Sequence, residues 1–376
     1  MTKVTTLIFI LIFTLCSFNL NAQTEVKNED KPLKGEWNFQ PEKVWETENA
    51  GDDILVNVRN IRIDDDGTVY LFDRKSFKFF VFSPEGKYLY SFGKRGEGPG
   101  EYKTAFTFFL VGKYITIPDM GKIHFFTKDG KFVKSFTITS YTMRPRAFID
   151  GNRFIIIQSG DEEKRKFDRL EIFDINTKER TTITEIIAEK SLTAVSSGGG
   201  MVLKLSDPNT TPMIIPVLDN NELYFGKNDK YLIKKMDLKG KEKLSFSIQG
   251  RERKKISTEV KKKRIDRIRI NNAKVPQEMA DQLIKNMPDQ CTYFGSIVID
   301  EKGLIYVYVT DISNETGQEL DIFSPQGKYM YHSNLQLPEG LKKHSSLYIK
   351  GDYMYVFAED EEGDGKLIKF KIEKPS

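Results

Sequence analysis

The pattern that decides the fold is clearest in residues 61–71, IRIDDDGTVYL, and residues 79–89, FFVFSPEGKYL. Each stretch places apolar residues on both sides of a glycine turn, which predicts two successive β-hairpins. The pattern returns as IVIDEKGLIYV in residues 297–307 and as DIFSPQGKYM in residues 321–330. The two copies share Asp-x-x-Gly-x-(Val/Ile)-Tyr and Phe-Ser-Pro-x-Gly-Lys-Tyr. The chain is therefore built from repeated units, and such repeats indicate the architecture directly.

The first turn of the pattern recurs along the chain at Gly67, Gly112, Gly151, Asn221, Gly303 and Gly351. The second turn follows at Gly86, Gly130, Thr177, Gly240 and Gly327. Four short antiparallel strands in a unit of about 40–50 residues are typical of one blade of a β-propeller. We therefore predict an all-β fold, a six-bladed β-propeller of four-stranded antiparallel blades. An open solenoid and two stacked sandwiches are the alternative arrangements of the same strands.

The last blade lacks one strand in this pattern. The sixth copy supplies strands in residues 346–349, 353–358 and 367–372. The segment Gly35–Trp45, which precedes the first copy, contains Trp37, Phe39, Val44 and Trp45. We predict that an N-terminal strand from this segment completes the last blade, because a closed ring leaves no unpaired sheet edge.

Two insertions interrupt the regular spacing of the turns. The first, about residues 188–212, contains three consecutive glycines at 198–200 but no Gly-Lys-Ser/Thr, so we predict a flexible loop and no phosphate site. The second, about residues 250–291, lies between blades four and five and is the one strongly helical stretch. Pro276 and Pro288 suit the start and the end of a helix. Its apolar face has helical spacing and consists of Ala280, Leu283, Ile284 and Met287.

Charge is nearly balanced over the whole chain, with 58 Lys+Arg against 54 Asp+Glu in 376 residues. The formal net charge of +4 is too weak to indicate nucleic acid as a partner. The segment Arg251–Arg269 is the exception, because it holds ten Lys+Arg and three Asp+Glu, a net charge of +7. Such a tract is usually a solvated helix face, and the alternative is a weak contact with an anionic surface.

The N-terminal residues have the pattern of a secretory signal peptide. Lys3 precedes the apolar run Leu7–Phe18, and Ala22 provides a small residue before the expected cleavage site. The run is shorter than the roughly 20 apolar residues that span a bilayer, so we predict no transmembrane segment. We expect a signal peptide over residues 1–22, a propeller over residues 23–376, and export to the periplasm or the cell surface and medium.

The two cysteines exclude a disulfide scaffold and a cysteine-rich zinc module. Lipidation at Cys16 is disfavoured, because Leu15 and Phe13 stand where lipoprotein processing prefers a small residue and a leucine. If Cys16 leaves with the signal peptide, Cys291 remains alone. We expect Cys291 to be a packed apolar residue.

Binding residues are expected in the loops of one propeller face. The loops between strands two and three, and those between consecutive blades, emerge on the same face, and loops on a rigid scaffold commonly carry binding groups. The glycine-rich connector 93–102 places Arg95, Glu97 and Glu101 there, with Tyr102 expected to pack between blades. Arg144 and Arg146 flank a proline in the next connector. Local pairing of these charges is the alternative to contact with a ligand.

The loops between strands two and three carry acids at matched places: Asp73, Asp119, Asp161, Asp229, Asp311 and Asp360. Asp119 and Asp311 complete our candidate binding set. A ring of carboxylates could hold a divalent cation such as Ca²⁺, although no cofactor is predicted. Because an acid recurs in every blade, a second interpretation is that each carboxylate accepts hydrogen bonds from the backbone of its own turn.

Motifs of familiar enzyme classes are absent from the sequence. There is no Gly-x-Ser-x-Gly, no His-Glu-x-x-His and no phosphate-binding loop. The three histidines, His124, His332 and His344, fall in or beside separate predicted strands. A hydrolase or lyase acting on a glycan, lactone or peptide with acids and a divalent metal is the alternative function.

The repeats, the signal peptide and the connector Gly-x-Gly-Pro-Gly-Glu-Tyr at residues 96–102 resemble the secreted bacterial six-bladed β-propellers of NHL/TolB-like type. Met287-Pro288 also resembles the end of that family's helical insert. The resemblance implies an architecture and a surface location, and it brings no catalytic residues. We therefore expect a binding scaffold for an envelope protein, peptide or glycan.

Overall fold

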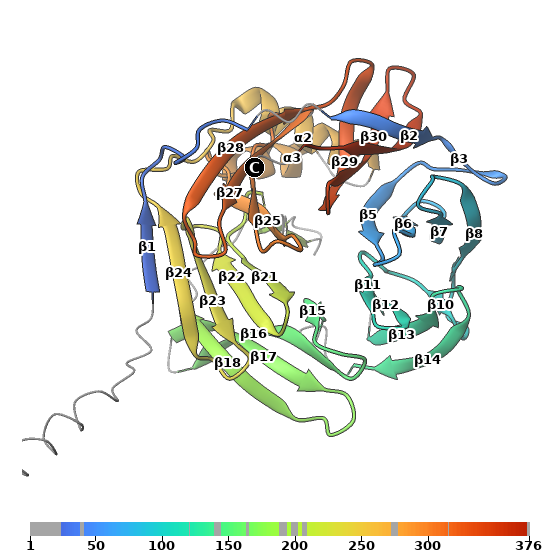
Figure 1. Cartoon of the computed structure of the whole chain (residues 1–376), viewed down its shortest axis with the longest axis horizontal. Helices are drawn as coiled ribbons and strands as arrows, with labels where there is room; N and C mark the ends of the chain where they lie inside the picture. The colour runs from blue at the N-terminus through green and yellow to red at the C-terminus, as the bar shows by residue number, and fades with distance from the viewer. Residues whose placement is uncertain are drawn as a thin grey trace, which may run out of the picture.

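The computed structural model describes residues 24–37, 41–119, 121–138, 144–162, 165–187, 194–196, 202–204, 209–271, 277–314 and 316–373. The predicted signal peptide and the triple glycine at 198–200 lie outside these residues. Six β-sheets follow one another around a central axis in chain order, as Figure 1 shows. Each contains four antiparallel strands, which are consecutive in the chain except in the last sheet, where β2 joins β29–β31, and one sheet carries β1 as an additional parallel strand. The predicted six-bladed propeller is therefore confirmed.

The first three blades are built from consecutive strands. Blade one consists of β5 (Val58–Ile63), β6 (Val69–Asp73), β7 (Lys78–Phe82) and β8 (Tyr88–Phe92). Blade two consists of β11 (Phe109–Val111), β12 (Tyr114–Asp119), β13 (Lys122–Thr127) and β14 (Phe132–Thr137). Blade three consists of β15 (Ala147–Phe148), β16 (Arg153–Glu162), β17 (Arg165–Asp174) and β18 (Arg180–Ile187).

Each of the last three blades contacts the N-terminal segment, which adds a strand to blade four and a strand to blade six and runs beside blade five. Blade four consists of β21 (Ile214–Asp219), β22 (Glu222–Lys227), β23 (Leu232–Asp237) and β24 (Glu242–Ile248), with β1 (Thr24–Asn28) added. Blade five consists of β25 (Phe294–Ile299), β26 (Ile305–Val309), β27 (Gly317–Phe323) and β28 (Tyr329–Gln336). Blade six consists of β29 (Leu341–Lys350), β30 (Tyr353–Asp360), β31 (Gly365–Lys371) and β2 (Glu42–Thr47).

Three two-stranded pairs lie in the connections between blades. They are β3 (Asn49–Ala50) with β4 (Asp53–Ile54), β9 (Lys94–Arg95) with β10 (Glu101–Tyr102), and β19 (Ala194–Ser196) with β20 (Val202–Lys204). The second pair lies in the glycine-rich connector and the third lies in the first insertion.

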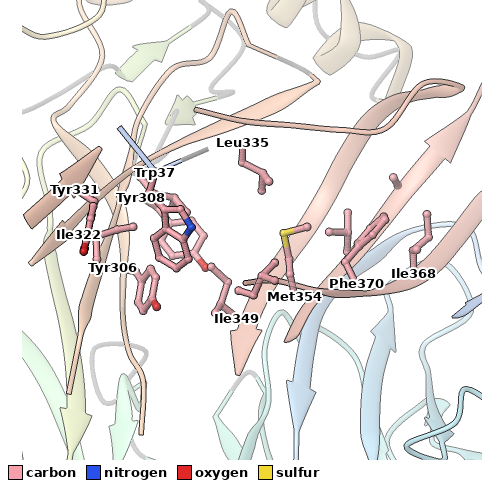
Figure 2. Close-up of a cluster of buried hydrophobic side chains, with 14 residues drawn as sticks. Trp37, Tyr306, Tyr308, Ile322, Tyr331, Leu335, Ile349, Met354, Ile368 and Phe370 are labelled. Atoms are coloured by element: carbon pink, nitrogen blue, oxygen red, sulfur yellow. The ribbon is translucent and has the colours of Figure 1, made fainter. Parts of the chain in front are cut away.

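The core lies between neighbouring blades. Strands β6 and β26 are buried along their whole length, because both faces of each blade are covered by the next blade. Ile61 and Leu71 of blade one pack with Phe357 of blade six, which closes the ring. Between blades five and six, tyrosines of β26 meet Ile349 and Met354 in a second apolar cluster, shown in Figure 2.

The repeated motif has a packing reason. Gly67 has a positive φ of 85°, which glycine adopts without strain. A Cβ on Gly67 would also lie 3.2 Å from the ring of Pro84, in the second turn of the same blade. Blade five repeats this contact, where a Cβ on Gly303 would lie 3.1 Å from Pro325. The Asp-x-x-Gly turn and the Ser-Pro-x-Gly turn therefore recur together because they pack against each other.

The N-terminal segment closes the ring and does more than was predicted. Strand β2 pairs antiparallel with β31 at the outer edge of blade six, which confirms the predicted closure. Strand β1 pairs parallel with β24 of blade four, and Glu36 forms a β-bridge with His332 of blade five. The segment thus covers the outer edges of three successive blades. The sequence did not predict the contacts with blades four and five, because any exposed sheet edge can accept a strand.

The side chains of this segment lie across the seams between blades. The Asn28 amide donates to the carbonyls of Ser247 in blade four and Gly327 in blade five, at 3.1 and 2.9 Å. The indole of Trp45 donates to the carbonyl of Pro84, which joins blade six to blade one, at 2.9 Å. These contacts add to the apolar packing that holds consecutive blades together.

The second insertion is helical, as predicted. It contains α2 (Thr258–Asn271) and α3 (Gln277–Asn286). Ala280, Leu283 and Met287 of the predicted apolar face are buried against Ile265 of α2. Among the described residues, no helix has the length and apolar character needed to cross a membrane. Cys291, just after this insertion, is buried, and burial raises the pKa of its thiol.

Candidate functional site

The strand order gives the propeller two different faces. The hairpin turns between strands one and two and between strands three and four lie on one face, which we call the turn face. The loops between strands two and three, the connectors between blades and both insertions lie on the opposite face, which we call the connector face. All of the sequence-predicted site residues lie on the connector face.

Glu101 and Tyr102 shape the glycine-rich connector. Tyr102 is fully buried between blades one and two, and its hydroxyl donates to the carbonyl of Phe77 at 2.7 Å. A Cβ on Gly93 would lie 1.9 Å from that hydroxyl, so this position requires glycine. Glu101 accepts a hydrogen bond from the amide of Gly98 at 3.0 Å, which lowers the pKa of its carboxyl. These two residues therefore hold the connector in its conformation.

The charged side chains predicted to bind a ligand on this face largely contact other side chains of the protein. The guanidinium of Arg95 lies over the ring of Phe77, with 5.0 Å to the ring centroid. Glu97 pairs with Lys103. Arg144 lies over a different ring, Phe106, at 4.8 Å. The arginines of the two connectors thus contact separate aromatic rings.

Arg74 approaches the same Phe106 ring, at 4.5 Å, so this half-exposed phenylalanine meets two guanidinium groups. Arg146 is exposed, and its backbone amide bonds to the carbonyl of Ile155 within blade three. These contacts are structural in kind, because cations stacked on aromatic rings stabilise the surface of a fold.

The repeated acids mostly accept hydrogen bonds from backbone amides. Buried Asp73 accepts from the amides of Val56 and Asn57, at 2.7 and 3.0 Å, and so holds the connector that enters blade one. Asp119 holds the next connector in the same way, through the amides of Lys103 and Thr104. Both carboxylates are occupied by the loop that passes over their own blade.

The later blades vary this arrangement. Asn228, next to Asp229, accepts from the amide of Met213 at 2.8 Å, while Asp229 pairs with Lys227. Asp311 and Asp360 accept from amides of their own turns. The side chain of Asp161 lies outside the described residues. In the described part of the chain, no group of three or more His, Cys, Asp or Glu side chains is placed to hold a metal ion.

A cavity of about 360 Å³ opens on the connector face beside blade five, and we call it the blade-five cavity. Its walls combine the first insertion, the helical insertion and strands of blade five. The lining includes Asn209, Arg264, Ser296, Tyr308, Asp311 and Asn314. Of the sequence-predicted site residues, Asp311 alone lines this cavity.

Three polar side chains at this wall have no hydrogen-bond partner within the described chain. The Tyr308 hydroxyl is buried without one. The Ser296 hydroxyl and the Asn314 amide, both partly buried, also make no hydrogen bond there. Native structures satisfy nearly all buried polar groups, so such a concentration is unusual. The cavity wall therefore offers hydrogen-bonding capacity that the fold itself does not use.

A second cavity, of about 430 Å³, lies next to the first and shares Val309 and Thr310 with it. The start of the predicted basic tract forms one wall, from Arg251 to Lys255. Much of that charge is used inside the protein. Lys254 pairs with Glu319 at 2.6 Å, and buried Lys261 pairs with Asp289 at 2.6 Å.

Beneath the second cavity lies a buried polar cluster around Asp321, which we call the Asp321 cluster. Asp321 has no solvent exposure. Its carboxylate accepts from Tyr231 at 2.6 Å, from Tyr329 at 2.7 Å and from Arg251 at 2.8 Å, and His332 Nδ1 lies 3.0 Å away. The cluster joins blade four, blade five and the helical insertion, so it fixes the insertion on the propeller.

This cluster was not predicted from the sequence, although the repeats contain a signal for it. When the repeat of blade five is aligned with that of blade one on Phe-Ser-Pro, Asp321 takes the place of Phe80. Phe80 is fully buried. A carboxylate at a buried repeat position needs partners, because an unpaired buried charge is very costly. The identity of those partners depends on segments far away in the chain.

The pKa values in the cluster shift in opposite directions. Burial acts to raise the pKa of Asp321, but hydrogen bonding from His332 and the charge of Arg251 hold it below its ordinary value. The hydrogen bond to Asp321 raises the pKa of His332 above its ordinary value. Asp321 therefore stays negatively charged to lower pH, and His332 stays positively charged to higher pH, than either group would without the other.

Loss of the proton from His332 is expected to weaken the protein. Because the pKa of His332 is raised in the folded state, its contribution is complete below about pH 6.5 and is lost as the pH rises through the folded pKa. Urea unfolding of the wild type between pH 5 and 9 should show this decline. The His332→Gln variant should show a flatter profile over the same range, and parallel profiles would contradict the assignment.

Comparisons with known proteins agree with the geometry. The family DUF5128, described as a six-bladed β-propeller, matches residues 46–323. A solved structure from Bacteroides fragilis, provisionally named an exported protein, is 16% identical, with a TM-score of 0.55 over 93% of this chain and 99% of that one. A DUF4221 member from Bacteroides vulgatus is 11% identical, with a TM-score of 0.56 over 90% and 98%. The search of curated proteins finds no match. The two solved structures show the fold alone.

Proposed function

The chain belongs to the DUF5128 family of six-bladed β-propellers, and from this premise we propose that it is an exported binding scaffold whose partner enters the blade-five cavity. The partner is a peptide or glycan of the cell envelope. Export is supported by the signal-peptide pattern in residues 1–22 and by the name of the Bacteroides fragilis neighbour.

The observation that carries this proposal is the set of unpartnered polar groups at the cavity wall. Ser296 and Asn314 provide a partly exposed hydroxyl and amide, and the Tyr308 hydroxyl adds a third unpartnered group that is fully buried in the free protein. All three can both donate and accept hydrogen bonds. Neutral groups of this kind suit the amides of a peptide or the hydroxyls of a sugar. A volume of about 360 Å³ is within the range of ligand pockets, roughly 300–1,000 Å³.

The position of the cavity supports the same conclusion. Asn209 from the first insertion and Arg264 from the helical insertion both reach it. The Asp321 cluster anchors the helical insertion to blades four and five, so the wall is held in place before a ligand arrives. A preorganised wall reduces the entropy lost on binding.

Two substitutions test the proposal, and one of them separates an effect on binding from an effect on stability. Tyr308→Phe removes an unpaired buried hydroxyl, so the stability of the free protein should stay the same or rise. Binding should nevertheless weaken about threefold to tenfold, as it should for Asn314→Ala, because each loses a hydrogen bond to the ligand. Peptide and glycan arrays probed with the purified protein would identify a ligand, and titration calorimetry would compare the variants.

The matched control is Asn152→Ala, which removes an exposed amide side chain from a turn on the opposite face. It should bind as the wild type does. If every array ligand binds Tyr308→Phe, Asn314→Ala and the wild type equally, the ligand does not use this cavity and the proposal is wrong.

A further inference from the structure

A third cavity, of about 320 Å³, opens on the turn face, opposite the blade-five cavity. It lies at the inner strands of blades one, two and six. We call it the Arg62 cavity. Its lining includes Arg62 of β5, Phe109 and Leu110 of β11, and Tyr348 of β29. Its walls are thus partly aromatic and apolar, and they contain one guanidinium group.

Arg62 is half-buried in this wall and has no acidic partner within the described chain. Its neighbours Ile61 and Ile63 pack toward blade six, so its side chain leaves the strand on the other face. One hydrogen bond runs from Nη1 to the carbonyl of Ile61, at 2.8 Å. The guanidinium lies 5.6 Å from the ring centroid of Tyr348 and 5.9 Å from that of Phe108. Within the described chain, no carboxylate forms an ion pair with it.

The electrostatics of the site agree with this geometry. Burial lowers the pKa of Arg62, and the charge that acts against this effect is that of Tyr348. An arginine that met a carboxylate would show the opposite direction, as Arg251 does beside Asp321. Apart from the bond to Ile61, no hydrogen bond within the described chain uses the five N–H donors of this half-buried guanidinium.

The other charges at the cavity cancel in pairs. Asp64 pairs with Lys128, and Asp65 pairs with Lys350 at 2.9 Å. Arg62 thus leaves a single positive charge at the cavity wall. A ligand with one negative charge would balance it.

We propose that the Arg62 cavity binds the carboxylate of a small organic acid, whose apolar or aromatic part lies against Phe109, Leu110 and Tyr348. The guanidinium fork matches the two oxygens of a carboxylate, which gives two parallel hydrogen bonds. The single net charge favours a monoanion over a phosphate dianion. This site is separate from the blade-five cavity, so either can fail without the other.

Benzoate is the probe for this site, because it joins one carboxylate to one aromatic ring. Titration calorimetry of the purified protein should show one site for benzoate, with binding at least tenfold weaker for benzamide and for inorganic phosphate. Arg62→Met keeps the apolar stem and removes the charge, so benzoate binding should fall at least tenfold. Arg153→Met, which removes an exposed arginine at another turn of the same face, should bind benzoate as the wild type does.

A melting experiment without ligand separates binding from a structural role. If Arg62 serves a ligand, Arg62→Met should melt at the same or a higher temperature, because a half-buried charge without a counter-charge is removed. If Arg62 serves the fold, the variant should melt lower. The proposal is wrong if the wild type does not bind benzoate, if Arg62→Met binds it equally, or if phosphate binds as tightly.

Discussion

Replacement of Trp37 by alanine is expected to lower the free energy of unfolding by about 3–5 kcal/mol, the usual cost of removing a buried large aromatic side chain. Trp37 is 7% exposed and packs between blades five and six, with its ring 5.9 Å from that of Tyr331 (Figure 2). Its indole donates to the carbonyl of Glu373 at 3.0 Å, and its amide donates to that of His332 at 2.7 Å. The substitution therefore removes both packing and a hydrogen bond at one seam.

Urea unfolding followed by tryptophan fluorescence and circular dichroism would measure this effect. Leu33→Ala is the matched control, because Leu33 belongs to the same segment but is 67% exposed. It should change the stability by less than about 0.5 kcal/mol. If Trp37→Ala were as mild as Leu33→Ala, the N-terminal segment would not contribute to holding the last blades together.

Asp321→Asn is expected to have a comparable cost, about 3–5 kcal/mol, because it breaks a buried ion pair from one side. The asparagine has the same shape, but it removes the one buried negative charge beside Arg251 and His332, and it leaves Arg251 only the half-exposed Asp30 as an ion-pair partner. The side chain of asparagine has a single oxygen that accepts hydrogen bonds, and its NH2 group only donates. It therefore cannot accept from Tyr231, Tyr329 and Arg251 together. The helical insertion should loosen first, since Arg251 connects it to the cluster.

The pH dependence identifies the charge as the cause. The pKa of Asp321 is lowered in the folded state, so its contribution is present above about pH 4 and is lost as the pH falls through the folded pKa. The difference in stability between wild type and Asp321→Asn should therefore shrink in acid. The control Asp129→Asn, at an exposed turn, should be nearly neutral. A difference independent of pH would mean that shape and not charge is responsible.

The repeats predicted the fold because their signals are local. The turn at Gly67 requires a positive φ, and Pro84 packs on it from the same blade, so both residues report on one small unit. The helix of residues 277–286 was found in the same way, from spacing within ten residues. The closure of blade six by β2 followed from counting strands.

The candidate site was predicted less well. Arg95, Glu101 and Tyr102 lie on the connector face, but their contacts are with the connector and its neighbours. The glycine-rich motif made them conspicuous for a structural reason, namely the close approach of Gly93 to Tyr102. Ser296 and Asn314 carry no motif and became visible only as the wall of a cavity.

The order of residues was thus sufficient to predict the blades, their number, the face that the loops share and the helical insertion. Each of these features depends on residue alternation and turn chemistry over a few tens of residues. Packing in three dimensions was needed to show that residues 24–47 cover three blades and that Arg251 meets Asp321. It was also needed to find Arg62 without an acidic partner. Such features join residues far apart in the chain, and their energies depend on burial, which no local pattern records.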